Sequence, residues 1–175
     1  MSKILVVDDE QSMRDFLAIL LTKEGHDVVT ARNGAEALRA VQAEIFDLVI
    51  TDVKMPGADG MEVLRSVKEI SPETVVIMIT AFATTEAAVE AMKIGAYDYI
   101  IKPFKVDELK LIIYNSLEKR HLRKENTLLK REIESKAGFA NFIGKSEPMQ
   151  KVFSLIRQVS DTKSTVLITG ESGTG

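Results

Sequence analysis

Short apolar runs that end in a charged residue recur through the first hundred residues of the chain. The runs are Lys3-Ile-Leu-Val-Val-Asp8-Asp9, Leu48-Val-Ile-Thr-Asp52 and Tyr99-Ile-Ile-Lys102. Runs this short and this rich in Val and Ile are typical of buried parallel strands. The carboxyl ends of parallel strands meet at one rim of a sheet, where ligands bind. Three acids and one base are therefore expected to converge at that rim.

Carboxylates gathered at one rim repel each other unless a cation or a proton compensates them. A hard divalent cation with oxygen ligands, most simply Mg2+, is the natural counter-ion, and the rim becomes a candidate phosphoryl-transfer site. Plainer explanations exist for each residue. Asp8, Asp9 and Glu10 could merely cap the following helix. Asp52 could form a turn, and Lys102 could be a solvated strand end.

Strand and helix patterns alternate as far as residue 105. We expect strands near 3–8, 27–31, 47–52, 75–80 and 98–102, and helices near 12–24, 34–44, 59–70 and 84–94. Turn signals rich in Gly and Pro separate these segments. Repeated strand–helix units with right-handed crossovers predict a doubly wound α/β fold, in which helices cover both faces of a five-stranded parallel sheet.

A long helix is predicted next, because residues 106–136 contain no Gly or Pro and are rich in Leu, Lys, Glu and Arg. Its first half has dense apolar residues that are expected to pack on the sheet. In its second half, Leu122, Asn126, Leu129 and Ile133 follow steps of four, three and four, which fit a short heptad seam. We predict a dimeric coiled coil here. A solvated helix that frays is the alternative.

Composition excludes several classes of protein. The net charge is −3. The chain has no cysteine, so neither a disulfide framework nor a thiolate metal site is expected. No apolar run approaches the ~20 residues of a membrane span, and no secretory signal is evident, so a soluble cytoplasmic protein with no membrane partner is expected. The basic stretch Lys119–Lys124 is flanked by Glu118 and Glu125. Pairing between residues four apart on an exposed helix explains it without a nucleic acid.

The last part of the chain begins a second strand–helix pattern. A helix start is predicted at 146–148, with an apolar stripe over Met149, Val152, Phe153, Ile156 and Val159. Residues 165–169 are predicted to form a strand. The segment that follows has the Gly-x4-Gly spacing of a Walker A phosphate loop, and its residues are Gly170, Glu171, Ser172, Gly173, Thr174 and Gly175.

Residues 3 to about 118 resemble the receiver domain of two-component response regulators. The pieces that carry the resemblance are Val7-Asp8-Asp9-Glu10, Thr51-Asp52-Val-Lys-Met-Pro56-Gly57-Ala-Asp59-Gly60, Ile79-Thr80-Ala81 and Tyr99-Ile-Ile-Lys102-Pro103-Phe104. The resemblance implies a flavodoxin-like sheet with the strand order 2-1-3-4-5. It also implies that Asp52 accepts a phosphoryl group from a sensor histidine kinase.

The same resemblance implies the ligands of the metal. Asp9 would bind Mg2+ directly and Asp8 through water, while Asp52 and the backbone carbonyl of Lys54 would complete the protein's ligands.

It also implies which residues read the phosphoryl group. Thr80 would hydrogen-bond that group, Lys102 would pair with it, and Tyr99 would be an aromatic switch residue. A plainer explanation for Tyr99 is a core aromatic whose hydroxyl lies in water.

The end of the chain resembles the opening of the AAA+ ATPase domain in sigma-54-dependent activators of the NtrC type. The pieces are Phe142-Ile-Gly-Lys-Ser146 and Leu167-Ile-Thr-Gly-Glu-Ser-Gly-Thr-Gly175. The resemblance implies a longer parent protein that binds ATP, sigma-54 RNA polymerase and promoter DNA. We expect no ATP hydrolysis by this chain, because the Walker A lysine and the arginine finger are not in it. The expected domains are a receiver over 1–118, a coiled-coil linker over 119–137 and an AAA+ fragment over 138–175.

Three rival functions are weighed against this reading. An Mg2+-dependent phosphohydrolase with an aspartyl-phosphate of the haloacid-dehalogenase type needs a second Asp two residues after the nucleophile, where this chain has Lys54. A dimerisation scaffold with a vestigial acid pocket and a P-loop ATPase fragment are the others. If the chain is such a regulator, the unphosphorylated dimer is expected to hold the ATPase domains apart and so to prevent their assembly into a ring. The opposite form of control, in which the receiver actively promotes ring assembly, stays open.

Overall fold

The structure is a computed structural model that describes residues 1–81, 84–137, 146–160, 165–167 and 169–170, and for residues 131–137 and 157 it describes the backbone only. The chain divides into two compact units, Met1–Glu125 and Asn126–Gly175.

A five-stranded parallel sheet forms the centre of the first unit. Its strands lie in the order β2-β1-β3-β4-β5, as predicted. They are β1 (Lys3–Val7), β2 (Asp27–Ala31), β3 (Leu48–Asp52), β4 (Val75–Thr80) and β5 (Asp98–Ile101). The helices between and after them are α1 (Gln11–Lys23), α2 (Gly34–Ala43), α3 (Gly60–Ile70), α4 (Thr85–Ile94) and α5 (Val106–Ala137).

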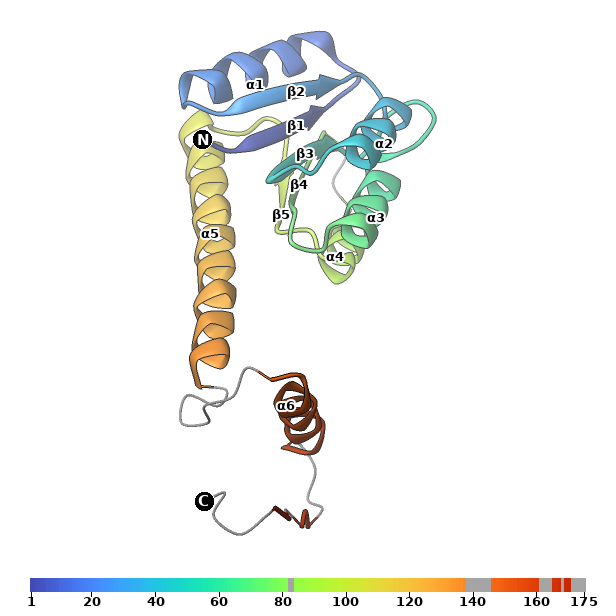
Figure 1. Ribbon diagram of the computed structural model, residues 1–175. Helices are drawn as coiled ribbons and strands as arrows, with labels where there is room; N and C mark the ends of the chain where they lie inside the picture. Colours follow the sequence, from blue (N-terminus) through green and yellow to red (C-terminus); the bar gives the residue numbers. More distant parts are fainter. Residues whose placement is uncertain (82–83, 138–145, 161–164, 168, 171–175) are drawn as a thin grey trace. The chain divides into compact units, whose positions relative to one another are not determined.

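Two apolar layers sandwich this sheet, because successive side chains of a strand point to opposite faces. Helices α1 and α5 cover one face, and α2, α3 and α4 cover the other (Figure 1). On the first face, Leu17 of α1 and Leu109 of α5 meet Ile50 and Ile77 of the central strands. The central strands are buried on both faces, which explains why their sequences read as continuous apolar runs.

Side-chain caps begin three of the helices. Asn33, Asp59 and Thr84 each accept a hydrogen bond from the backbone N–H three residues later, at α2, α3 and α4. Such caps satisfy N–H groups that the first helical turn leaves unpaired. Helix α4 ends at Gly95, whose φ of +115° lies in the left-handed region that glycine favours.

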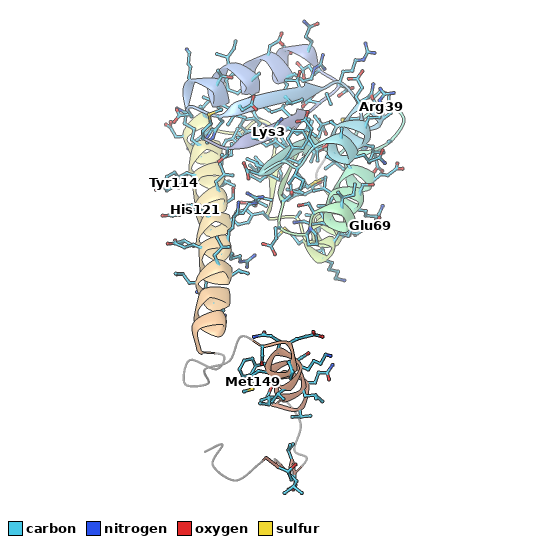
Figure 2. All side chains as sticks on the ribbon, viewed as in Figure 1. Lys3, Arg39, Glu69, Tyr114, His121 and Met149 are labelled. Atoms are coloured by element: carbon cyan, nitrogen blue, oxygen red, sulfur yellow. The ribbon has the colours of Figure 1, made fainter. Side chains whose placement is uncertain are left out.

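The long helix α5 is continuous over Val106–Ala137, as the composition predicts. Leu109 and Ile113 are buried, whereas Tyr114 and His121, labelled in Figure 2, have exposed side chains. Arg120 pairs with Asp47 and donates from Nε to the carbonyl of Glu73 at 3.0 Å. These contacts tie α5 to the receiver fold beyond residue 118, and the domain boundary predicted there stays a prediction.

The predicted seam lies on the second half of α5. Leu122, Asn126 and Leu129 are exposed, and the side chain of Ile133 lies outside the described residues. The dimer therefore stays a prediction. None of the helices in the described part of the chain combines the length and apolarity that a bilayer span requires.

Helix α6 (Glu147–Ser160) confirms the predicted second helix. Met149, Phe153, Ile156 and Val159 of its apolar stripe are half-buried, and Val152 is exposed. The strand predicted over 165–169 is wrong for its described residues, because 165–167 and 169 have no regular structure. A strand needs a neighbour for its backbone hydrogen bonds, and none pairs with this segment among the described residues. Of the predicted phosphate loop, only Gly170 lies within them.

Candidate functional site

Three carboxylates meet where β1 and β3 end. Asp8 and Asp9 follow β1, and Asp52 is the last residue of β3, so the parallel pairing of these neighbouring strands brings them to one rim. One carboxylate oxygen from each of the three lies within 4.8 Å of the others. Asp8 and Asp52 are buried, and Asp9 is exposed. The convergence predicted from the sequence is thus found in the structure.

Lys102 joins this cluster from the end of β5. Its Nζ donates to Oδ2 of Asp8 and to Oδ2 of Asp52, both at 2.7 Å. The Lys102 side chain is only 14% exposed, so the alternative of a solvated strand end is wrong. The backbone N–H of Lys102 donates to the carbonyl of Thr80 at 2.8 Å, which fixes the start of the turn after β5.

Backbone N–H groups hold the other oxygen of each buried acid. Oδ1 of Asp8 accepts from the N–H of Glu10 at 2.9 Å, and Oδ1 of Asp52 accepts from the N–H of Lys54 at 3.0 Å. The capping alternative fails for Asp8 and Asp9, because the N-cap residue of α1 is Glu10. Glu10 takes that position as the alternative allows, but its side chain forms no cap hydrogen bond. Asp52 does form a local turn contact, but that contact leaves Oδ2 directed at Lys102.

The electrostatics of the cluster favour more positive charge than Lys102 supplies. Burial raises the pKa of Asp8, and the hydrogen bonds from Lys102 and from the Glu10 N–H offset this only in part. Burial alone would lower the pKa of Lys102, but its hydrogen bonds to Asp52 and Asp8 outweigh that effect and raise it. One ammonium thus pairs with two of the three clustered carboxylates. An all-oxygen donor set with excess negative charge suits Mg2+, which prefers carboxylate and carbonyl ligands.

Arg14 is a contributor that the sequence reading missed. Its Nη1 donates to the backbone carbonyls of Asp8 and Asp9 at 2.7 Å and 2.9 Å. The guanidinium therefore fixes the loop that carries both acids. A signal was present, because Arg14 lies near the start of α1, where the helix dipole disfavours a cation unless a tertiary partner holds it.

Gly60 is a second residue that the sequence analysis did not identify as a contributor to the site. A Cβ atom at this position would lie 2.0 Å from the backbone oxygen of Asp52. The N–H of Gly60 donates to the carbonyl of Val53 at 2.9 Å, so α3 begins directly against the end of β3. A glycine as the first residue of a helix, just after the capping Asp59, is the signal for such a close approach.

Thr80 and Tyr99 lie beside the cluster. Thr80 is fully buried at the end of β4, and Asp52 pairs in register with the preceding Ile79. Tyr99 packs against the core between the sheet and α2, α3 and α4. Its hydroxyl is buried and has no hydrogen-bond partner among the described residues, so the alternative of a hydroxyl in water is wrong. Burial raises the pKa of Tyr99, and the charge of Asp52 raises it further.

Comparison with known proteins identifies both parts of the chain. Residues 4–114 match the response regulator receiver domain, and residues 142–175 match the sigma-54 interaction domain. The regulatory protein AtoC of Escherichia coli K12 is 35% identical over 99% of this chain and 38% of that protein. The transcriptional regulatory protein ZraR of the same strain is 40% identical over 98% of this chain and 38% of its own length. The chain thus spans less than half of these relatives.

Solved structures agree in fold. A response regulator receiver domain protein from Clostridium thermocellum has a TM-score of 0.66 at 38% identity, over 70% of this chain and 98% of that one. NtrX from Brucella abortus has a TM-score of 0.69 at 37% identity, over 98% of this chain and 38% of that one. The beryllofluoride-activated NtrC4 receiver domain dimer has a TM-score of 0.65 at 38% identity, over 69% of this chain and 99% of that one. The chain belongs to the response regulator family, as a receiver domain of the NtrC type followed by the start of a sigma-54 interaction domain.

Proposed function

We propose that Asp52 accepts a phosphoryl group from a sensor histidine kinase and that this modification controls a sigma-54-dependent activator. The observation that carries the proposal is the position of Lys102 Nζ, 2.7 Å from both Asp8 and Asp52. Asp9 completes the same cluster. A cation, a carboxylate nucleophile and a set of metal-binding oxygens within one small volume are the parts that phosphoryl transfer requires.

The metal site of the proposal consists of Asp8, Asp9, Asp52 and the backbone carbonyl of Lys54. Mg2+ bound there would neutralise charge on the phosphoryl oxygens during transfer. The protein's own contribution is to hold the ligands in position. Arg14 fixes the carbonyls of the Asp8–Asp9 loop, and the Lys54 N–H orients the Asp52 carboxylate.

In the transfer step, a carboxylate oxygen of Asp52 attacks the phosphorus of a phosphohistidine. An O–P bond forms as the P–N bond breaks, and the imidazole nitrogen keeps the electron pair and takes up a proton. The Lys102 ammonium stabilises the negative charge on the phosphoryl oxygens, and the Thr80 hydroxyl donates a hydrogen bond to one of them. The protein's contribution to catalysis is position and electrostatics rather than a general base.

The proposed switch couples the phosphoryl group to Tyr99. A buried hydroxyl without a hydrogen-bond partner is costly, by roughly 1–3 kcal/mol, so the Tyr99 side chain is poised to change its position. Movement of Thr80 toward the phosphoryl group would open space for the ring. The surface of α4, β5 and α5 would then repack, as a shift between two pre-existing arrangements.

At the level of the longer protein, we infer a homodimer built on the seam of Leu122, Asn126, Leu129 and Ile133. The exposed Leu122 and Leu129 side chains support this inference. The matched sigma-54 interaction domain supports a parent protein that hydrolyses ATP and acts with sigma-54 RNA polymerase at promoter DNA. A cytoplasmic location follows from these partners. The unphosphorylated dimer is proposed to hold the ATPase domains apart.

The decisive test is labelling by acetyl phosphate in the presence of Mg2+. Asp52→Asn is expected to abolish formation of the acyl phosphate, because the nucleophilic oxygen is lost. Asp15→Asn, a change of an exposed acid on α1, serves as the matched control and is expected to label as wild type does. Wild-type labelling of Asp52→Asn, measured by intact-protein mass spectrometry, would show that another residue is the acceptor.

A further inference from the structure

A cleft of about 550 Å3 lies in the first unit, at the amino-terminal ends of the strands, whereas the acidic cluster lies at their carboxyl ends. Its lining includes Thr74 and Val75, where β4 begins, and Asp98, where β5 begins. Helix α3 contributes Lys68, and α5 contributes Ser116 and the basic residues beyond it. The site proposed for phosphorylation uses the other ends of these two strands, so the cleft is a separate feature.

The lining of the cleft is rich in positive charge. Four cationic side chains line it, against the two carboxylates of Glu73 and Asp98. The cations are Lys68, Lys119, Arg120 and Arg123. Asp47 pairs with Arg120, and the other three cations still outnumber the two lining carboxylates. The cleft therefore carries an excess of positive charge that favours an anion.

Lys68 shows how this charge is held in place. Its Nζ donates to the carbonyl of Thr74 at 2.7 Å, which orients the ammonium but does not neutralise it. The pKa of Lys68 is lowered, first by burial and further by the charge of Arg123, although Glu73 acts in the opposite direction. The ammonium is therefore fixed in a half-buried position that favours an additional negative charge nearby.

The basic residues of α5 are fixed by the receiver fold. Arg120 donates from Nε to the carbonyl of Glu73 and pairs with Asp47, so pairing within the helix does not explain its position. Lys119 Nζ lies 5.5 Å from the centre of the Tyr97 ring, a cation–π distance. Both contacts direct side chains of the helix toward the start of β4 and β5.

We propose that this cleft binds a small organic molecule that carries a diphosphate group. Its volume falls within the ~300–1,000 Å3 of small-molecule sites, which favours a compact ligand over a protein segment. Several Lys and Arg side chains around one cavity match the multiple anionic oxygens of a diphosphate. The half-exposed Met92 and the Tyr97 ring offer apolar contact for the organic part.

Inorganic pyrophosphate is the probe for the test. The full 175-residue chain, labelled with 15N, is titrated with it in EDTA, which removes divalent metal from the acidic cluster. Saturable shifts are expected for the amides of Gly95, Ala96 and Ser116, which line the cleft. The Asp52→Asn variant is expected to bind pyrophosphate as wild type does, so failure here and failure of the phosphorylation proposal are distinguishable.

The variants separate a specific site from general charge attraction. The double variant Lys119→Gln/Arg123→Gln is expected to bind pyrophosphate at least about tenfold more weakly. Lys124→Gln/Lys130→Gln loses the same charge from exposed positions of the same helix and is expected to bind as wild type does. Thermal melts check that both variants are folded. Equal weakening in both pairs, or no saturable shift in wild type at millimolar pyrophosphate, would overturn the proposal. So would a response to an acidic peptide but not to pyrophosphate.

Discussion

At the scale of single residues, burial and charge compete in Asp8. Its side chain is 3% exposed, and burial raises its pKa above the ordinary value of 3.8 despite the contact with Lys102. The folded protein therefore binds a proton more tightly at Asp8 than the unfolded chain does. Its contribution to stability is largest at low pH and falls as pH rises from the ordinary value through the folded pKa. Lys102 acts in the same direction in the alkaline range, because its folded pKa is also raised.

Asp8→Asn is accordingly expected to raise the melting temperature at neutral pH in EDTA. The substitution removes a buried charge that is only partly compensated, and Lys102 keeps its contact with Asp52. The gain should vanish at pH values below the ordinary pKa, where Asp8 is protonated anyway. Thermal melts across the acid range measure this. An unchanged or lower melting temperature at neutral pH would contradict the electrostatic account.

Binding of Mg2+ to the acidic cluster is expected to stabilise the protein by compensating the same negative charge. Wild type at about 100 times its dissociation constant for Mg2+ should gain about 2.7 kcal/mol of stability. The Asp9→Asn variant should gain much less, because an exposed ligand of the cluster is lost. Denaturant titrations with and without Mg2+ measure both gains, and equal gains would remove Asp9 from the metal site.

The residues of the acidic cluster differ in how far they could be predicted. Asp52 and Lys102 end apolar runs, so the topology alone brings them to one rim. Arg14 could not be predicted in the same way, because its role depends on which carbonyls the loop after β1 presents to α1. The buried hydroxyl of Tyr99 depends on packing from α2, α3 and α4, which a strand pattern does not specify.

At the scale of elements, the start of α3 is set by contact with β3 rather than by helix propensity. Alanine is favoured over glycine in helices by about 1 kcal/mol, which alone predicts that Gly60→Ala stabilises the protein. The added Cβ would meet the Asp52 backbone at 2.0 Å. Backbone atoms cannot move away cheaply, so the clash outweighs the propensity.

Gly60→Ala is therefore expected to destabilise the protein by about 1–3 kcal/mol, the usual cost of overpacking. It should also slow labelling of Asp52, because α3 would be displaced from the end of β3. Glu69→Ala, on the exposed side of the same helix (Figure 2), is the control and should change stability by less than about 0.5 kcal/mol. Urea denaturation measures both, and a stabilised Gly60→Ala would refute the close packing.

The linker seam allows a matched comparison of two neighbouring leucines. Leu129 lies on the predicted seam and Leu128 does not, yet the two residues are 50% and 51% exposed. Lys has nearly the helix propensity of Leu, so either substitution keeps the helix. Leu129→Lys is expected to weaken a dimer at least about tenfold, and Leu128→Lys should leave it nearly unchanged. Sedimentation at low protein concentration decides, and equal effects would place the interface elsewhere.

Elements differ in predictability for a physical reason. The five strands of the sheet were predicted correctly because each has a neighbour that completes its hydrogen bonds, and two helical layers bury the central strands. The apolar segment 165–169 has a similar composition, but it has no such neighbour among the described residues. Composition indicates what a segment can become, and pairing determines whether it does.

At the scale of the whole molecule, beryllofluoride tests pocket chemistry and switching together. As a phosphoryl mimic bound with Mg2+ at Asp52, it is expected to change the oligomeric state of the chain, measured by light scattering. Asp52→Asn should show no change. A change that persists in the variant would mean that the oligomeric response does not originate in the acidic cluster.

The Lys102 ion pairs connect strands that are not neighbours in the sheet. Asp8 and Asp52 belong to the middle of the sheet, while Lys102 follows the edge strand, with β4 in between. The Lys102 side chain therefore forms a bridge across the end of β4, and Thr80 is the last residue of that strand. Phosphorylation of Asp52 would convert one carboxylate of this bridge into an acyl phosphate, so the edge strand and the central strands would have to readjust together.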